Sequence, residues 1–107
     1  MKAHQTEREF MQQVADLARL HGWRVAHFRP GRTADGGWRT ACQFDAAGFP
    51  DLLLIRDDRL IVAEVKVGRG KLTPEQNEWL RAFGGCGATA CVWRLEDWQE
   101  IVELLEG

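Results

Sequence analysis

The 107-residue sequence has few cysteines, no long apolar run and no excess of positive charge. Its three cysteines form no Cys-x-x-Cys pair, and its three histidines do not complete a zinc-binding pattern. No apolar run is longer than a segment such as Leu52–Ile55, whereas a membrane span needs roughly 20 residues. The first ten residues hold no apolar signal segment. We therefore expect reduced thiols, a cytoplasmic location and no membrane partner.

Charge is unevenly distributed along the chain, although 14 basic and 16 acidic residues give a net charge of only −2. Five arginines stand against Asp35 alone between residues 19 and 39, and residues 95–107 carry five acids with no Lys or Arg. A basic face turned toward a polyanion and an ordinary solvated surface both explain this distribution. The charge pattern alone does not choose between them.

The length and the apolar periodicity predict a single α/β domain over residues 1–107. We expect helices over 6–21, 73–83 and 97–105, and strands over 23–28, 52–55, 60–67 and 88–93, in the order αβββαβα. Thr6 with Glu9, and Thr73 with Gln76, have the spacing of capping boxes that begin helices. Residues 29–47 form a long Gly- and Arg-rich connection, which in a small domain is usually functional or mobile.

The central hairpin predicts the most specific geometry. If Asp57 and Asp58 are its two turn residues, Asp51 faces Glu64 across the strands, with Cβ atoms about 5 Å apart. Lys66, two residues beyond Glu64, projects on the same face. Both faces of the hairpin are apolar, so we expect helices to cover both sides of the sheet.

Two like charges at the rim of a sheet are unfavourable unless a cation relieves them. Hard oxygen ligands of this kind suit Mg²⁺ or Mn²⁺, with water and substrate phosphate at the remaining positions. A neighbouring ammonium can orient a water or stabilise charge on a phosphate. The alternative is that Asp51 merely ends a loop while Glu64 and Lys66 form an edge ion pair. The joint spacing favours the metal hypothesis and attack of an activated water on a phosphodiester.

The segment Gly48-Phe49-Pro50-Asp51, followed by Glu64-Val65-Lys66, resembles the PD-(D/E)XK nuclease signature. The wider pattern is similar to the VRR-NUC branch of that superfamily, through Thr6-Glu7, Gly22-Trp23, Leu72-Thr-Pro-Glu-Gln76 and Val92-Trp93-Arg94. This resemblance implies a restriction-endonuclease-like αβββαβ core. Its central mixed four-stranded sheet would be flanked by helices, with an additional C-terminal helix.

The resemblance also implies a Mg²⁺-dependent DNA endonuclease, with Mn²⁺ as a substitute, acting on branched, flapped or junction DNA. Asp51, Glu64 and the Val65 backbone carbonyl would be metal ligands, and Lys66 would position the water. The alternatives are a non-cleaving DNA-binding subunit with the same fold and an interaction module with a structural metal pair. RNA as the substrate is a further alternative. A bacterial or phage origin is expected, and a homodimer would suit a junction although no sequence feature requires one.

The resemblance adds an acid from the first helix, and Glu7 and Glu9 compete for that role. Glu7 lies beside the buried stripe of the helical wheel, whereas Glu9 points to solvent and can close the capping box. We therefore choose Glu7 as a catalytic residue and metal ligand, against a helix-start acid favoured by the macrodipole. Gln76 has two interpretations, as the capping partner of Thr73 or as a polar contact near the metal or phosphate.

Contacts to the DNA backbone are expected from basic residues near the site, namely Arg29, Arg32, Arg39, Arg69 and Lys71. His27 lies where the first strand leaves the sheet and is more often packed than catalytic. Trp38 could stack on a base, fold over the core or pack on a second subunit. Gly68-Arg69-Gly70-Lys71 does not fit a phosphate-binding loop, so no nucleotide cofactor is expected.

Overall fold

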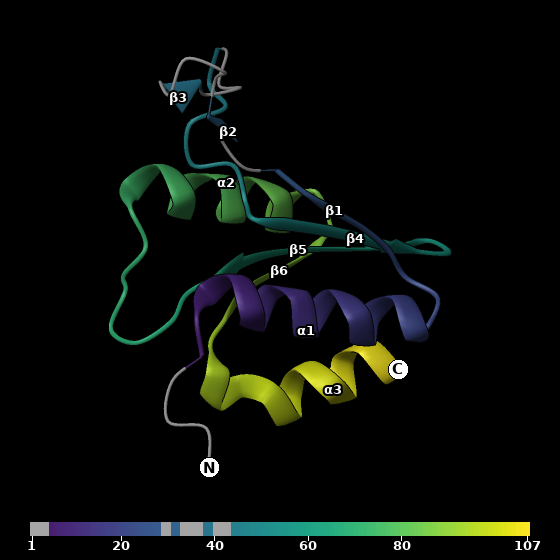
Figure 1. The fold of residues 1–107 in the computed structure, drawn as a ribbon. Helices are drawn as coiled ribbons and strands as arrows, with labels where there is room; N and C mark the ends of the chain where they lie inside the picture. Colours follow the sequence, from purple (N-terminus) through teal and green to yellow (C-terminus); the bar gives the residue numbers. More distant parts are fainter. Residues whose placement is uncertain (1–4, 29–30, 33–37, 40–43) are drawn as a thin grey trace.

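The computed structural model describes residues 5–28, 31–32, 38–39 and 44–107, with backbone alone for the two short pairs. The protein is an α/β structure in which a four-stranded mixed sheet lies between α2 on one side and α1 with α3 on the other (Figure 1). The elements are α1 (Glu7–Leu20), β1 (Arg24–His27), β2 (Gly31–Arg32), β3 (Trp38–Arg39), β4 (Leu52–Arg56), β5 (Arg59–Val65), α2 (Pro74–Gly85), β6 (Thr89–Trp93), the 3-10 helix η1 (Leu95–Asp97) and α3 (Trp98–Glu106). Strands β2 and β3 form a separate antiparallel pair that the sequence analysis did not predict.

The sheet has the strand order β1-β4-β5-β6. Strands β1, β4 and β5 pair antiparallel, whereas β6 pairs parallel to β5 after a crossover through α2. The hairpin register predicted from the two-residue turn is confirmed, because Arg56 pairs with Arg59 and Leu53 with Val62. Asp57, the first turn residue, has a φ of 55°, a value that Asp tolerates in tight hairpin turns.

The hydrophobic core lies between the sheet and the pair of helices α1 and α3. It contains the inward positions of β4 and β5, together with the apolar stripes of both helices. Its fully buried side chains include Phe10, Val14, Leu52, Leu54, Ile61, Val65, Ile101 and Leu105. At one end of this core the Trp23 indole Nε1 donates a hydrogen bond to the Leu105 carbonyl at 2.9 Å. Burial of this set supplies the main stabilisation of the domain.

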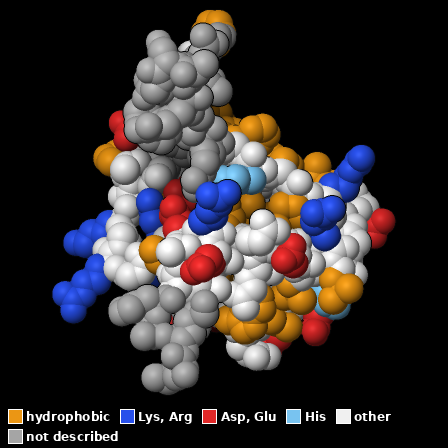
Figure 2. Space-filling view, in the orientation of Figure 1, with side chains coloured by type: hydrophobic (Ala, Val, Ile, Leu, Met, Phe, Trp, Pro, Cys, Tyr) orange, Lys and Arg blue, Asp and Glu red, His pale blue; other side chains and the backbone are white. Residues whose placement is uncertain are grey.

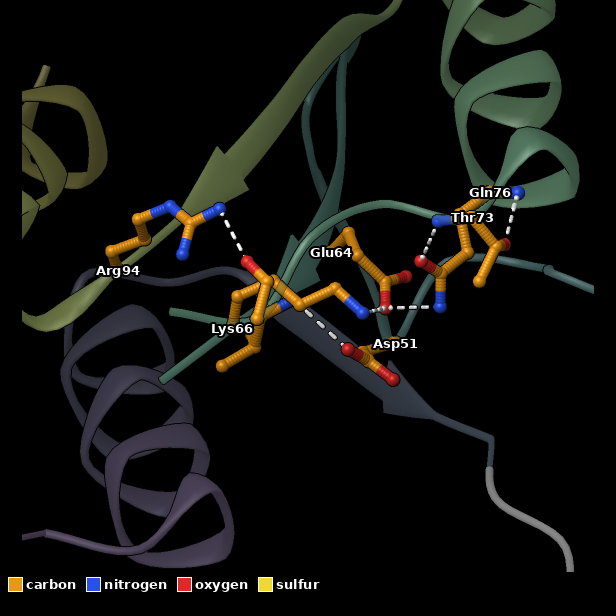
Figure 3. A network of polar contacts seen from close by, with 8 residues as sticks. Asp51, Glu64, Lys66, Thr73, Gln76 and Arg94 are labelled. Atoms are coloured by element: carbon orange, nitrogen blue, oxygen red, sulfur yellow. Dashed lines mark hydrogen bonds and ion pairs between the residues drawn. The ribbon is translucent and has the colours of Figure 1, made fainter. Parts of the chain in front are cut away.

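Helix α2 covers only part of the opposite face of the sheet. Val62 and Leu80 are buried there, but Ile55 is 41% exposed and Leu60 is half-buried. The expectation that helices cover both sides is therefore confirmed, with unequal coverage. Because α2 begins beside the ends of β4 and β5 that carry Asp51 and Glu64, its N-terminus lies at the predicted site (Figure 3).

Local signals predicted the helix starts better than the helix ends. Both capping boxes are present, at Thr6 with Glu9 and at Thr73 with Gln76. The predicted end of α2 at Gly84-Gly85 is wrong, because both glycines lie within the helix. The turn comes later, at Gly87 with a φ of +92°, where the Ala88 N–H donates to the Phe83 carbonyl. Such a left-handed residue after the C-cap is the usual end of a helix.

The tryptophans do not all lie in the main core. Trp23 and Trp93 are buried there, and Trp98 packs at its edge. Trp79 is the exception, because it is half-buried in a second aromatic cluster formed by Phe28, Phe49, Trp79 and Phe83. Its indole donates hydrogen bonds to the carbonyls of Asp45 and Ala47. This cluster attaches the loop that precedes β4 to helix α2.

Within the described ranges, Cys86 and Cys91 are free thiols, and burial raises the pKa of the Cys91 thiol. No helix in this part of the chain is long and apolar enough to cross a membrane. Cys42 and Arg29 lie outside the described residues, as do the side chains of Arg32, Trp38 and Arg39.

Candidate active site

The open end of the β4–β5 hairpin brings two carboxylates together. Asp51 immediately precedes β4, and Glu64 is the last residue but one of β5. The Asp51 carboxylate accepts a hydrogen bond from the Val65 N–H at 2.9 Å, which holds it against the end of β5. Figure 3 shows the Asp51 and Glu64 side chains on the same side, with the Lys66 ammonium close to both. The juxtaposition predicted from the register is therefore present.

Glu64 is the only charged side chain among the described residues that is buried, with 3% of its surface exposed. Its Oε2 atom accepts a hydrogen bond from Gln76 Nε2 at 3.0 Å and lies 3.6 Å from Lys66 Nζ. Its Oε1 atom is buried and has no hydrogen-bond partner. Leaving a buried carboxylate oxygen without a partner is unfavourable by roughly 1–3 kcal/mol or more. A cation at this oxygen would remove that cost.

The pKa of Glu64 is raised from 4.5 to about 7. Burial is the largest cause, followed by the negative charge of Asp51 and by the hydrogen bond that the protonated Glu64 carboxyl can form to Asp51. Lys66 lowers the pKa through its charge and its contact, but by less than the other effects raise it. The effect of one ammonium therefore does not outweigh burial and the Asp51 charge. A pair of carboxylates in this state favours binding of a further cation.

The Val65 backbone carbonyl is directed to the same space as the carboxylates. The Lys66 N–H donates to the Trp93 carbonyl on β6 at 3.0 Å, and the chain contains no cis peptide bond among the described residues. In a planar trans peptide the N–H and the preceding C=O point in opposite directions. The Val65 C=O group therefore points away from β6, toward the side on which Asp51 lies.

Gln76 combines the two interpretations that the sequence left open. Its Oε1 atom accepts from the Thr73 N–H at 2.9 Å, and its own N–H donates to Thr73 Oγ1 at 3.1 Å, which completes the capping box. The Nε2 end of the same amide donates to Glu64. One side chain thus begins α2 and connects that helix to the buried carboxylate (Figure 3).

The close approach of helix α2 explains why position 48, three residues before Asp51, is a glycine. Its φ is +83°, and a Cβ built on it would lie 2.7 Å from backbone and side-chain carbons of Glu75 and 2.8 Å from the Gln76 nitrogen. A side chain at this position would collide with the first turn of α2. The close approach fixes the Asp51 segment relative to Gln76.

His27 and Arg94, which the sequence analysis did not assign to the site, form hydrogen bonds to backbone segments at its edge. His27 Nδ1 lies 2.8 Å from the backbone oxygen of Asp51, so the tautomer protonated at Nδ1 donates there. The Arg94 guanidinium donates to the carbonyls of Gly70 at 2.8 Å and Gly68 at 3.4 Å. Arg94 thereby holds the loop that follows Lys66. The position of Arg94 directly after a predicted strand was the available signal, but its partners are backbone atoms that no motif reveals.

The remaining predicted site residues with described side chains are Glu7, Arg69 and Lys71. Glu7 is half-buried on α1, whereas Glu9 is exposed and closes the capping box with Thr6. Across the described ranges no three His, Cys, Asp or Glu side chains converge in a metal-binding arrangement, so Glu7 does not join the two carboxylates in such a group. Its catalytic role stays a prediction. Arg69 and Lys71 are exposed on the loop held by Arg94.

Scans of the chain against protein-family models, curated proteins and solved structures found no match. The resemblance to the VRR-NUC nucleases therefore rests on the motifs quoted above and stays a prediction.

Proposed function

We propose that the protein is a Mg²⁺-dependent endonuclease that hydrolyses phosphodiester bonds in DNA, with Mn²⁺ as a substitute. The observation that carries the proposal is the buried Glu64 carboxylate beside Asp51, with one oxygen unpartnered and a pKa near 7. The ion pair with Lys66 is made by Oε2 and provides no partner for Oε1. Perturbed carboxylates near a surface loop are typical of functional sites.

The donor set fits Mg²⁺. Mg²⁺ prefers hard oxygen ligands and typically uses one or two protein carboxylates, with water and phosphate oxygens completing the octahedron. Asp51 and Glu64 would supply the carboxylates and Val65 the carbonyl oxygen. Bound Mg²⁺ would supply Lewis-acid stabilisation of the phosphate charge and lower the pKa of water.

The chain's own residues then have distinct roles. The Lys66 ammonium, held 3.6 Å from Glu64 Oε2, is placed to orient the attacking water and to stabilise the charge that develops on the phosphate. Gln76 keeps the Glu64 carboxylate in one orientation through its hydrogen bond. Attack of water at phosphorus with cleavage of the P–O3′ bond leaves a 5′-phosphate and a 3′-hydroxyl, as the resemblance implies.

Selectivity for branched, flapped or junction DNA belongs to the same proposal. Basic side chains project at the left of the molecule in Figure 2, where Figure 1 places the loop between β5 and α2. This loop carries Arg69 and Lys71, which suit phosphate contacts that fix the position of DNA without reading its sequence. We also propose a homodimer, a cytoplasmic location and a bacterial or phage origin.

The test is cleavage of labelled linear, nicked, flapped, splayed and four-way DNAs in Mg²⁺, in Mn²⁺ and in EDTA. We expect metal-dependent cutting by the wild type and none by Asp51→Ala, with branched substrates cut fastest. Binding of these DNAs without cutting in either metal would contradict the nuclease proposal and favour the non-cleaving DNA-binding subunit.

A further inference from the structure

A groove of about 790 Å³ lies between helix α1 and the edge strand β1. Its apolar residues include Met11, Trp23 and Leu52, each at most 5% exposed. Its rim carries three arginines, Arg8 and Arg19 from α1 and Arg24 from β1. In Figure 2, Lys and Arg side chains flank a strip of apolar atoms that runs from the central histidine toward the right edge.

The positive charge of this groove is not neutralised within the described part of the chain. None of the groove residues is acidic, and Arg8, Arg19 and Arg24 form no ion pair with the described carboxylates. Asp16, the acid three residues before Arg19 on α1, accepts a hydrogen bond from Gln12. Arg56 and Arg94 differ from the groove arginines because their guanidinium groups donate to backbone carbonyls. The groove arginines are therefore available to an external anion.

One end of the groove lies beside the backbone of Asp51. His27 belongs to it and contacts the backbone oxygen of Asp51, and the groove residue Leu52 directly follows Asp51. At the other end lie Arg19 and Arg24, at the end of α1 and the start of β1. Arg19 lies eleven positions after Arg8, which in an α-helix corresponds to about 17 Å. This length spans at most about five nucleotides, the number for a strand stacked at the 3.4 Å rise of duplex DNA, and fewer for an extended strand.

We infer that this groove binds the sugar–phosphate backbone of one single strand of nucleic acid that continues to the Asp51–Glu64 site. The inference rests on the proposed function for the identity of the ligand. Because the groove lies between one helix and one edge strand, we take its occupant to be a strand with unpaired bases rather than a duplex. The exposed arginines would contact phosphates, and the partly exposed apolar lining residues, Ala15 and Val25, would contact sugars or bases.

Features of β1 disfavour a protein segment as the occupant. Addition of a strand from a peptide or a second copy requires a long, apolar edge. Strand β1 has four residues, and the first and last of these, Arg24 and His27, are exposed and polar. Short edges with charged side chains resist strand addition.

The test measures binding of a fluorescein-labelled 20-nucleotide oligo(dT) by anisotropy in EDTA, at several salt concentrations. The double variant R19A/R24A should bind about tenfold more weakly than the wild type, with the slope of log K against log salt smaller by about 1.4. The variant R19K/R24K should retain most of that slope, because lysine still neutralises phosphate. The control R81A, an exposed arginine on α2 across the sheet, should bind like the wild type. A duplex of the same length should bind more weakly and be unaffected by R19A/R24A.

Three results would overturn the inference: no binding of oligo(dT) by the wild type, equal binding by the wild type and R19A/R24A, or equal weakening of duplex and single strand by R19A/R24A. Since no metal is present, this outcome is independent of cleavage. If R19A/R24A weakens binding but no DNA is cut in Mg²⁺ or Mn²⁺, the groove inference stands and the nuclease proposal fails. If DNA is cut while binding is unaffected by R19A/R24A, the groove inference fails and the nuclease proposal stands.

Discussion

Gln76 Nε2, at the start of α2, donates a hydrogen bond to Glu64 Oε2, at the end of β5, at 3.0 Å across twelve positions of sequence. The same Gln76 side chain closes the capping box at the start of α2. The helix start and the orientation of the buried carboxylate therefore depend on one amide. A capping signal that is common in helices has here a second role at the candidate site.

The substitution Gln76→Glu separates these two roles. Glutamate still completes a capping box with Thr73, but it places a second carboxylate at hydrogen-bond distance from Glu64. We expect the free energy of unfolding to fall by about 1–3 kcal/mol at pH 8. The loss should be smaller at pH 5, where the pair holds protons. Urea denaturation at both pH values measures this difference.

Gln12→Glu is the matched control, because Gln12 also donates to a carboxylate, that of Asp16, at an exposed position. Its effect should stay within about 0.5 kcal/mol at both pH values. Equal effects of the two substitutions at pH 8 would contradict the account that Glu64 is buried and that a further carboxylate beside it is repelled.

The raised pKa of Glu64 predicts a pH dependence of stability in metal-free protein. The folded state retains a proton on Glu64 up to about pH 7, whereas an ordinary Glu releases it near pH 4.5. The unfolded state therefore binds fewer protons in this window, and stability falls as the pH rises from about 4.5 to 7. Glu64→Gln should remove this contribution in thermal melts recorded across that range.

Mg²⁺ should oppose the loss of stability that accompanies ionisation of Glu64. Because the metal requires the ionised carboxylate, we expect Mg²⁺ to raise Tm more at pH 8 than at pH 5.5. The increase should be absent in Glu64→Gln and in Asp51→Asn. A Mg²⁺-induced rise in Tm that is equal at both pH values, or that persists in both variants, would contradict metal binding at this pair.

The hairpin register shows how far local rules extend. A two-residue turn at Asp57-Asp58 fixes every cross-strand pair up to Leu52 and Ala63, so the juxtaposition of Asp51 with Glu64 and Lys66 follows from counting. The capping boxes were also predictable, because each depends on residues three apart.

Features that depend on tertiary contact were not predictable in this way. The need for Gly48 arises from the first turn of α2, which is 27 residues away in sequence. Trp79 has the apolar character of a core residue, yet its partners are the aromatic side chains of a separate cluster. The predicted end of α2 is too early. Two adjacent glycines allow a helix to end but do not require it, and the chain turns at Gly87 instead.

Gly48→Ala tests the packing of the Asp51 segment on α2. Both the left-handed φ and the 2.7 Å approach to Glu75 oppose a Cβ, so we expect a loss of about 2–4 kcal/mol in the free energy of unfolding. Gly68→Ala is the matched control, since Gly68 also has a positive φ, +61°, but nothing lies within 4 Å of its Cβ position. That variant should lose only about 1–2 kcal/mol. If urea denaturation gives equal losses, the close contact does not matter.

Arg94→Met tests the loop that follows Lys66. Loss of the hydrogen bonds to Gly68 and Gly70 should release the loop that carries Arg69 and Lys71. We expect KM for DNA to rise about three- to tenfold with kcat changed less than twofold, because the hydrogen bond from the Lys66 N–H to the Trp93 carbonyl keeps the Lys66 backbone in place. Steady-state cleavage kinetics would show this split. A fall in kcat at constant KM would instead assign Arg94 a direct role in the chemistry.

Metal-dependent cleavage of branched DNA by conservative carboxylate variants tests the central claim most directly. Asp51→Asn and Glu64→Gln keep side-chain volume but remove the ionisable oxygen, so the initial rate in Mg²⁺ should fall at least about 100-fold. Asp58→Asn, at the exposed turn of the same hairpin, should cut at the wild-type rate. Cleavage by Asp51→Asn or Glu64→Gln at the rate of Asp58→Asn, or an undiminished wild-type rate in EDTA, would contradict the account.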